Sequence, residues 1–380
     1  MPSSWFTLVP LTLVLAWLFQ EGLRHLAVSM DLVDLPNSRK IHRRPVPLSG
    51  GIGIFAPLSL AMIVWLARGA SGMEFLHGLG LFTAMGMITL TGFIDDFRPL
   101  SPSKRLLVQA MASFLLWNVG VRLDVIQLGG FTLDLGLLSL PLTLLWFMGF
   151  MNTSNFMDGM DGLSGGMTLI ALGGLLISGG TQSSVFGPAV LVLALMVAVY
   201  LAFNLSTRRK VFLGDSGSLT LGMSVGILGI LLAKPAAGAG TALSWHPLAI
   251  VLAAYSVGIA DVAVSIIRRS RRGASIFKAD SHHFHHRLLR AGLDWKWTLA
   301  ALHGLAGLAV FAVSVPRYGG VWALIQFLVP SSAVVGAGVR LLKVGLVRQS
   351  VVLPMDKPDG SHLSVASDEE PEAMRAKGGR

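Results

Sequence analysis

The sequence predicts an all-α, polytopic integral membrane protein, and two observations lead to this fold class. Apolar runs of about 17–25 residues recur along the chain, and each is long enough to cross a hydrocarbon core about 30 Å thick. Only 13% of the 380 residues are charged, whereas soluble domains have about 25%. The alternating segments of about ten residues that mark a transmembrane β-barrel are not seen, so helices are expected to satisfy the backbone.

Eleven of these apolar runs are candidate transmembrane helices. The first is followed by EGLRHLAVSMDLVD and not by a small-residue cleavage site, so a retained helix is expected there rather than a signal peptide. The sixth and eighth runs are rich in glycine, which makes their pattern weaker. In chain order the expected spans are 5–25, 51–68, 76–94, 105–122, 137–155, 163–179, 185–204, 217–233, 247–267, 298–315 and 320–342.

The Lys and Arg residues of the loops give the expected orientation. If the first helix starts outside, most positive residues fall in loops on the inner side, as the positive-inside rule requires. The N-terminus is then periplasmic, and eleven spans leave the C-terminus in the cytoplasm. Residues 1–348 are expected to form one transmembrane domain, and the polar, acidic segment 349–380 is expected to be a disordered cytoplasmic tail.

The net charge and the cysteine count exclude other classes. The charge of +10 follows from this loop topology, so no nucleic-acid partner is expected. The chain has no cysteine, which excludes a disulfide framework and a thiolate metal site. Between the fourth and fifth spans, the alternation within residues 124–135 around a Gly pair predicts a small outer hairpin.

The polar clusters of the chain fall on one side of the predicted membrane. Asp95-Asp96, residues 152–161, Asp215 and residues 282–287 all lie at inner ends of spans or in inner loops. Because these segments are far apart in sequence, their common side predicts a shared cytoplasmic site.

Asp95 and Asp96 stand in GFIDDFRPLSPSK, where a span meets the cytoplasm, with Lys104 nearby. Adjacent carboxylates repel each other, and charge is costly at the edge of the hydrocarbon. A solvated helix end would explain the pair. So would a Mg²⁺ site, since this hard cation takes one or two carboxylates together with phosphate oxygens and water.

The stretch NTSNFMDGMDGLSGG, residues 152–166, lies between two apolar runs. Asn152, Asn155 and Asp158 recur at every third position, which places them on one side of a helix. The glycines after them loosen the helix, so Asp161 is free to point elsewhere. An Asn/Asp/Gly turn is the alternative, but a turn needs one or two such residues and not four.

Two further aspartates stand at or within expected spans. Asp215 stands in VFLGDSGSLTLG at a membrane boundary, where a Ser/Gly-rich helix start can hold an anion, and where Asp215 or Ser216 is also the expected N-cap of the eighth span. Asp261 lies within the ninth span. A proton relay, a helix cap and a pair with an arginine are all open for it.

Four histidines and an arginine crowd the stretch SHHFHHRLLR. Neutral imidazole binds zinc, but this spacing is not typical of zinc sites and no cysteine assists. A basic loop that clamps a diphosphate fits better, because Arg and protonated His donate to phosphate oxygens.

Together these stretches resemble the polyprenyl-phosphate N-acetylhexosamine-1-phosphate transferase superfamily, also called the MraY/WecA or glycosyltransferase 4 family. The resemblance implies transfer of a phospho-sugar from a UDP-sugar to undecaprenyl phosphate with release of UMP and with Mg²⁺, or Mn²⁺ in its place. The matching stretches occur in family order between residues 39 and 292: RKIHRRPVPLSGGIGI, GFIDDFRPLSPSK, NTSNFMDGMDGLSGG, FLGDSGSLTLG and ADSHHFHHRLLRAG.

The resemblance also implies roles for individual residues. Asp95 is similar to the group that contacts or deprotonates the lipid phosphate, with Asp96 beside it, and Lys104 resembles the phosphate-binding lysine. Asp215 and Asn155 resemble magnesium ligands. The catalytic carboxylates implied in this way are Asp95, Asp96, Asp158 and Asp215. The nucleotide-binding residues implied are Asn152, Asp158 and Asp161. The diphosphate and sugar site, HxHHR, is matched by His283, His285, His286 and Arg287.

The histidine stretch resembles the N-acetylglucosaminyl branch, so UDP-GlcNAc is the expected donor. The alternative donor is UDP-MurNAc-pentapeptide, which the muramoyl-pentapeptide translocases use. Those enzymes have three contiguous histidines in this stretch instead. Gly258 and Ile276 stand where relatives usually have proline, and Ile276 lies in the sugar-facing loop, which leaves the donor open. The resemblance implies the first membrane step of an envelope polysaccharide such as O-antigen or common antigen, at the cytoplasmic face of the bacterial inner membrane. A homodimer is left open.

Two other classes remain as alternatives. An ion-coupled transporter would use clustered carboxylates and Asp261, but such sites lie near the midplane between repeats, and no repeat is seen. A membrane scaffold with a metal-binding histidine loop would leave the Asp95-Asp96 pair and the segment 152–166 unexplained.

Overall fold

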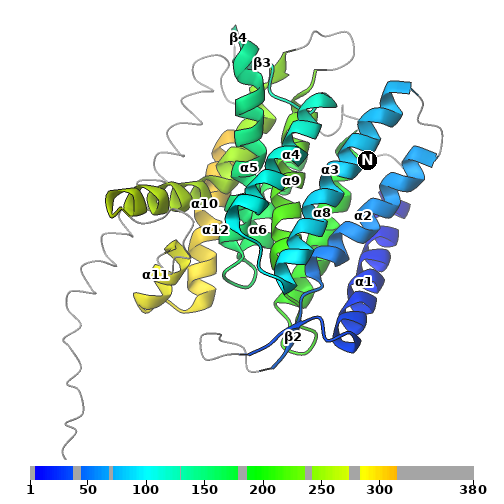
Figure 1. Ribbon diagram of the computed structural model, residues 1–380, viewed down its shortest axis with the longest axis vertical. Helices are drawn as coiled ribbons and strands as arrows, with labels where there is room; N and C mark the ends of the chain where they lie inside the picture. Colours follow the sequence, from blue (N-terminus) through cyan, green and yellow to red (C-terminus); the bar gives the residue numbers. More distant parts are fainter. Residues whose placement is uncertain are drawn as a thin grey trace, which may run out of the picture.

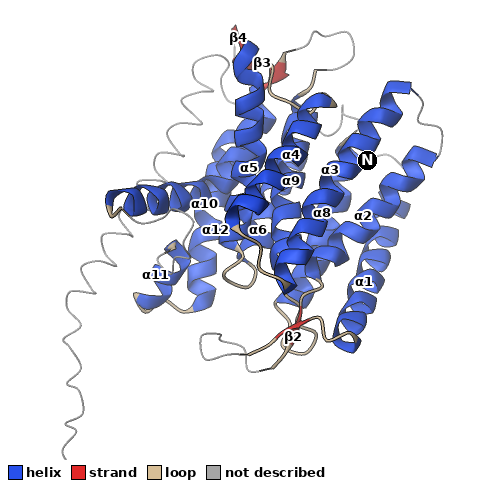
Figure 2. Ribbon diagram, viewed as in Figure 1, coloured by secondary structure: helices blue, strands red, loops and turns tan. Residues whose placement is uncertain are grey.

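Helices make up most of the computed structural model, and short strands lie only at the ends of the helical bundle (Figure 2). The structure describes residues 5–36, 44–67, 72–128, 130–178, 186–235, 242–273 and 283–314. The helices are α1 (Trp5–Ser29), α2 (Gly50–Ala67), α3 (Gly72–Phe97), α4 (Pro102–Asn118), α5 (Ser139–Met157), α6 (Leu163–Ile177), α8 (Gly187–Asn204), α9 (Gly214–Ala233), α10 (Trp245–Arg271), α11 (Phe284–Arg290) and α12 (Trp295–Ser314).

The first ten expected spans all coincide with helices, and their ends agree to within a few residues. The expected eleventh span, 320–342, and the tail 349–380 lie outside the described residues. In the described part of the chain, six helices are long and apolar enough to cross a membrane, which is the pattern of a polytopic membrane protein. They are Phe75–Phe97, Gly136–Met157, Gly187–Asn204, Gly214–Ala233, Trp245–Arg271 and Trp295–Ser314.

The helix at the centre of the bundle is α9, in which every residue from Ser216 to Ala233 is buried. It packs against α2, α3, α5, α6 and α10. Its glycines explain the weak apolar pattern of this span, because small residues let neighbouring backbones approach closely in a membrane. A Cβ at Gly222 would collide with the backbone of Phe150 and Met151 on α5, and one at Gly229 would lie 2.9 Å from the Val251 side chain on α10.

Strands mark the two ends of the bundle, and Figure 1 shows β2 at one end and β3 and β4 at the other. At the hairpin end, β3 (Val125–Leu128) pairs antiparallel with β4 (Phe131–Asp134), so the predicted hairpin is confirmed. β3 also pairs in parallel with β5 (Leu243–Ser244), which was not expected. At the β1–β2 end, β1 (Val33–Asp34) pairs with β2 (Val46–Pro47).

The segment before α9 is tied to the start of α2 at the β1–β2 end. The backbone N–H of Phe212 donates to Pro47 (2.9 Å), and the N–H groups of Gly50 and Gly51 donate to Phe212 (3.0 Å) and Leu213 (3.1 Å). These bonds fix where α9 begins relative to α2.

The expected N-cap of α9 is wrong. Neither Asp215 nor Ser216 caps the helix, because both lie within its first turn, after Gly214. The capping acceptor is Asp96 on α3, whose carboxylate accepts the N–H groups of Asp215 (2.6 Å) and Ser216 (3.3 Å). A carboxylate from another helix thus satisfies the free N–H groups and the positive end of the α9 dipole.

Gly214 should be more sensitive to substitution than another glycine of similar backbone geometry. Gly214 has φ 70° and a Cβ there would lie 2.6 Å from Asp96 Oδ2, whereas Gly120 has φ 75° and open space around it. We expect Gly120→Ala to cost about 1 kcal/mol for the left-handed backbone. Gly214→Ala should cost clearly more, because the Asp96 carboxylate must move. Thermal unfolding of both variants in detergent measures the difference, and equal losses would contradict the role of Asp96.

Candidate active site

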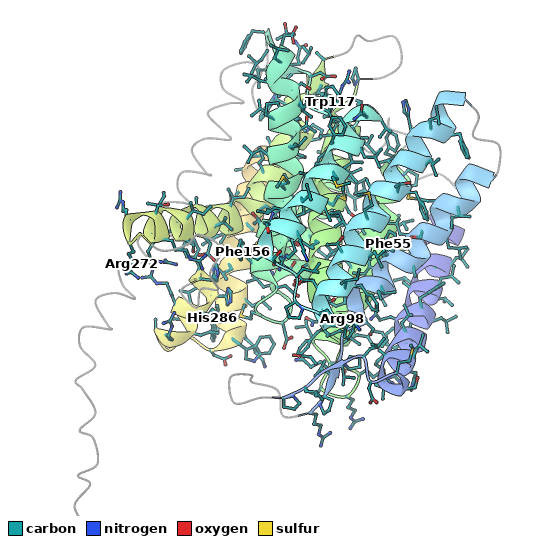
Figure 3. All side chains as sticks on the ribbon, in the orientation of Figure 1. Phe55, Arg98, Trp117, Phe156, Arg272 and His286 are labelled. Atoms are coloured by element: carbon teal, nitrogen blue, oxygen red, sulfur yellow. The ribbon has the colours of Figure 1, made fainter. Side chains whose placement is uncertain are left out.

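The polar clusters that the sequence predicted on one membrane face do come together, at the β1–β2 end of the bundle. Figure 3 shows Arg98 and His286 in that half of the molecule, while Trp117 lies near the hairpin end. The residues come from the end of α3, the start of α4, the end of α5, the start of α9, and α11. The predicted convergence is therefore confirmed.

A guanidinium group joins polar side chains of three other helices. Arg105 on α4 forms ion pairs with Asp95 on α3 (2.8 Å) and Asp215 on α9 (3.2 Å). It also donates to the side-chain oxygen of Asn155 on α5 (3.1 Å). The Asn155 amide donates in turn to Asp215 (2.6 Å) and Ser218 (3.0 Å). We refer to Asp95, Arg105, Asn155 and Asp215 as the acidic cluster.

Asp95 and Asp96, although adjacent, point to different partners. Asp95 is 9% exposed, and its second oxygen accepts the N–H of Leu100 (2.6 Å), which holds the turn between α3 and α4. Asp96 caps α9 and so fixes the backbone of Asp215. The repulsion expected between the two carboxylates is relieved because each has its own donors.

Lys104, the predicted phosphate-binding residue, is exposed, and Arg105 is the cation that reaches the acidic cluster. One residue along a helix turns the side chain by about 100°, so the two cations leave α4 in different directions. Sequence reasoning missed Arg105. Its place next to Lys104 in SPSKR was the available signal. The rotation of α4 relative to α3 and α9 decides which of the two side chains faces the acidic cluster.

Asn152, predicted to bind nucleotide, faces α4. Its amide nitrogen donates to Gln109 Oε1 (2.7 Å), and Gln109 donates back to Asn152 Oδ1 (3.4 Å). Gln109 is fully buried. A reciprocal amide pair of this kind joins two membrane helices, one turn away from Asn155 and the acidic cluster.

The loop after α5 carries the other two predicted aspartates. Asp158 is the C-cap of α5, and burial raises its pKa well above the ordinary value, with the carboxylates of Asp215, Asp96 and Asp161 adding to the rise. Asp161 forms an ion pair with Lys210 from the loop before α9. The two acids therefore differ: Asp158 is the one whose charge is disfavoured, whereas Asp161 has its own cation.

Asn204, at the end of α8, holds this loop in place and was not expected from the sequence. Its side-chain oxygen accepts the N–H of Gly162 (2.8 Å), and its amide donates to the Val211 carbonyl (3.0 Å) and to Asp161 (3.4 Å). Gly162 has φ 80°, which glycine adopts readily. Asn204 therefore links the segment 158–162 to the segment before α9.

Asp261 on α10 holds the histidine segment. Its carboxylate accepts the backbone N–H of Phe284 (3.2 Å), the first residue of α11, and contacts His283 Nδ1 at 3.1 Å. The side chain of Asp261 is 10% exposed. Of the roles left open for Asp261, the geometry corresponds to a helix cap, although the helix is α11 and not α10.

The histidines form a row of rings beside the end of α5. The His283 ring packs on Phe156 (centroids 5.3 Å apart) and is stacked with His285 (6.0 Å), which contacts His286 (4.2 Å). Figure 3 shows Phe156 and His286 on the same side of the bundle, and Arg287 follows them on α11.

His285 points at the loop that carries Asp158. A Cβ at Gly159 would lie 2.8 Å from His285 Nε2, so glycine is needed for this close approach. Within the described residues, this buried Nε2 has no hydrogen-bond partner. Burial lowers the pKa of His285 to about 3, with further contributions from His286 and His283. His285 is thus a neutral imidazole with one free polar atom aimed at the loop.

Of the two positions where relatives usually have proline, Gly258 lies within the described residues and Ile276 does not. Gly258 packs closely on α5, where a Cβ would collide with the side chains of Met157 and Thr153. The lack of a Cβ is therefore required by helix packing. Ile276 lies outside the described residues, as do Arg39, Lys40 and Arg43 of the first matching stretch.

The acidic cluster fits a hard divalent cation. Side-chain oxygens of Asp95, Asn155 and Asp215 all face one positive group, and oxygen is the donor that Mg²⁺ prefers. Within the described residues, no three His, Cys, Asp or Glu side chains are grouped as a metal site. Any metal bound here would therefore use the amide oxygen of Asn155, or oxygens of a substrate, beside the carboxylates.

Comparisons with known proteins decide the family. Residues 78–233 match the model of glycosyl transferase family 4. The chain is 30% identical to the decaprenyl-phosphate N-acetylglucosaminephosphotransferase of Mycolicibacterium smegmatis, over 95% of this chain and 91% of the relative. The chain belongs to the polyprenyl-phosphate N-acetylglucosamine-1-phosphate transferase family.

Other members of the polyprenyl-phosphate N-acetylglucosamine-1-phosphate transferases match over most of their length too. The undecaprenyl-phosphate alpha-N-acetylglucosaminyl 1-phosphate transferase of Escherichia coli K12 is 30% identical, over 79% of this chain and 83% of its own. A probable undecaprenyl-phosphate N-acetylglucosaminyl 1-phosphate transferase of Bacillus subtilis is 28% identical, over 79% and 81%. The match to glycosyl transferase family 4 includes the acidic cluster and the loop 158–162 and ends before the histidine segment.

The low pKa of His285 predicts a loss of stability in mild acid. The unfolded chain binds a proton at His285 near pH 6.5, whereas the folded chain does so near pH 3. As the pH falls below 6.5, the titration of His285 therefore lowers the free energy of unfolding by about 1.4 kcal/mol for each pH unit. Between pH 7.5 and 5.5 the wild type should lose about 1.4 kcal/mol more than His285→Gln. Unfolding curves of the substrate-free protein test this, and equal losses would contradict it.

The cap on α11 predicts a local effect at Asp261. Asp261→Ala removes the acceptor of the Phe284 N–H, which costs about 1–3 kcal/mol for a buried donor, while Asp261→Asn keeps one oxygen acceptor. Amide hydrogen exchange of peptides covering 283–290 should be fastest in Asp261→Ala and intermediate in Asp261→Asn. Peptides from α9 serve as the internal reference. Unchanged protection of α11 in the alanine variant would show that Asp261 does not hold it.

Proposed function

We propose that this protein transfers GlcNAc-1-phosphate from UDP-GlcNAc to undecaprenyl phosphate, releasing UMP and forming undecaprenyl-diphosphate-GlcNAc. The relatives are named as transferases of N-acetylglucosaminyl 1-phosphate to undecaprenyl or decaprenyl phosphate. The observation that carries the proposal in this chain is the acidic cluster, in which four helices bring Asp95, Arg105, Asn155 and Asp215 together at one end of the bundle.

We also propose that the β1–β2 end faces the cytoplasm of a bacterial inner membrane. The apolar runs would give eleven spans, and the distribution of Lys and Arg would then give a periplasmic N-terminus and a cytoplasmic C-terminus. A site at this border suits the reaction, because the lipid phosphate lies at the headgroup level and the UDP-sugar arrives from water. The product would be the first lipid-linked sugar of an envelope polysaccharide.

In the proposed reaction, an oxygen of the lipid phosphate attacks the β-phosphorus of UDP-GlcNAc, and UMP leaves. Such a step needs positioning and charge neutralisation more than covalent catalysis by the protein. Mg²⁺, held by Asp215 and Asn155, would neutralise charge on the diphosphate. Asp95 would orient the acceptor phosphate or take its proton, and Asp96 would act as a positioning residue by holding the start of α9.

The loop 158–162 and the histidine segment would hold the donor. His285 has a buried Nε2 without a hydrogen-bond partner in the described residues, beside Gly159. In the tautomer that carries its hydrogen on Nε2, the neutral imidazole can donate this hydrogen to a diphosphate oxygen. Arg287 is the charged donor on the same helix. Asp161, which contacts Asn204 and Lys210, would accept a hydrogen bond from the nucleotide.

Release of UMP from UDP-GlcNAc by the purified protein with undecaprenyl phosphate and Mg²⁺ tests the function. Asp215→Asn should reduce the rate by about a hundredfold or more, since it removes a preorganised charge from the reacting centre. The protein should still elute as a folded, monodisperse species. Asp134→Asn, the same change on β4 at the hairpin end, is the control and should retain the wild-type rate.

The same assay distinguishes the donors, the acceptors and the alternative class. UDP-GalNAc and UDP-MurNAc-pentapeptide replace UDP-GlcNAc in parallel reactions, and decaprenyl phosphate replaces the undecaprenyl lipid. A preference for the pentapeptide donor would move the protein to the muramoyl branch. No UMP release with any donor, together with ion-driven uptake in proteoliposomes, would favour a transporter.

A further inference from the structure

The inference concerns Arg105 and rests on the proposed function. The guanidinium contacts one side-chain oxygen from each of three helices: Asp95 Oδ2 at 2.8 Å, Asp215 Oδ2 at 3.2 Å and Asn155 Oδ1 at 3.1 Å. Two of these residues, Asp215 and Asn155, are the ones that would hold Mg²⁺. A cation held by these two residues would therefore lie close to the guanidinium of Arg105.

Electrostatics give a reason for this arrangement. Three carboxylates, those of Asp95, Asp96 and Asp215, meet at the ends of α3 and α9, and two of them, Asp95 and Asp215, form ion pairs with Arg105. Carboxylates this close repel strongly when water is excluded, and the Asp95 side chain is only 5% exposed. A planar guanidinium can donate to several oxygens at once, which a lysine ammonium does less well. Arg105 can thus hold Asp95 and Asp215 close together despite their repulsion.

The same contacts conflict with metal binding. A magnesium ion coordinates oxygen at about 2.0–2.1 Å and needs the lone pairs of its ligands. Asn155 Oδ1 accepts a hydrogen bond from Arg105, and Asp215 Oδ2 forms an ion pair with the same guanidinium, so a second cation there would meet a positive charge a few ångströms away. Binding of a divalent cation to this pair of oxygens therefore requires the guanidinium to withdraw from them. An arginine released in this way is next to the site and can donate to a phosphate oxygen.

We propose that Arg105 is a built-in counter-cation: it holds Asp95, Asn155 and Asp215 together in the metal-free protein and competes with the divalent cation for their oxygens. It is a positioning residue, because it acts through the residues that would hold the metal. Lys104, next to it in sequence, is exposed and makes no contact with the acidic cluster in the described part of the chain, so it provides a matched control.

The test measures metal affinity without substrate. Full-length protein in detergent is titrated with Mn²⁺, and free Mn²⁺ is followed by electron paramagnetic resonance, for the wild type, Arg105→Gln, Arg105→Lys and Lys104→Gln. Removing a positive charge a few ångströms from the site should tighten Mn²⁺ binding about tenfold in Arg105→Gln. Lys104→Gln should retain the wild-type affinity. Arg105→Lys should be intermediate, because one ammonium does not bridge all three oxygens.

Thermal unfolding gives a second readout. Without metal, Arg105→Gln should unfold at a lower temperature than Lys104→Gln, because its carboxylates are left without a counter-charge. Saturating Mn²⁺ should raise the midpoint of Arg105→Gln by more than that of the wild type, since tighter binding stabilises the folded state more.

The outcomes separate this inference from the proposed function. Wild-type or weaker Mn²⁺ affinity in folded Arg105→Gln would overturn the inference and leave the transferase assignment intact. If Arg105→Gln does not fold, Arg105→Lys decides: tighter binding supports competition, and unchanged binding refutes it. If the wild type binds no Mn²⁺ yet releases UMP from UDP-GlcNAc, the metal assignment fails and this inference fails with it.

Discussion

The hydrogen bonds from the start of α9 to the Asp96 carboxylate are the contact on which the fold and the site both depend. They join α3 to the central helix, whose every residue after Asp215 is buried. A carboxylate at a helix N-terminus satisfies free N–H groups and the positive end of the dipole. Since Asp215 belongs to the first turn of α9, its side chain is positioned by the same bonds.

Glycine makes this arrangement possible at the β1–β2 end. Gly92 on α3 lies so close to the backbone of Asp215 and Ser216 that any Cβ would collide with it, and Gly51 on α2 contacts Gly217 in the same way. In lipid, helices associate through close packing and hydrogen bonds rather than through a hydrophobic driving force between them. Glycines at these contacts of α2, α3 and α9 are therefore a condition for bringing the three helix ends together.

The site combines two halves that are held by different means. The acidic cluster is held by ion pairs between membrane helices, and Arg105 is its cation. The histidine segment is held by the cap that Asp261 places on α11, and His285 approaches Gly159 in the loop after α5. The loop 158–162, fixed by Asn204, lies between the halves.

The sequence by itself determined ten of the described helices, all but α11, and the convergence of the polar motifs at one end of the bundle. Apolar runs must form helices in lipid to satisfy their backbone, and the positive loops orient them, so Asp95, Asn155 and Asp215 could be assigned to one face. Only the tertiary structure decided the partners within that face. It directs Arg105 rather than Lys104 inward and gives Asp96, not Asp215, the capping of α9. The physical reason is that hydrogen bonds between distant helices depend on how each helix is rotated and packed, and local sequence patterns do not record that rotation.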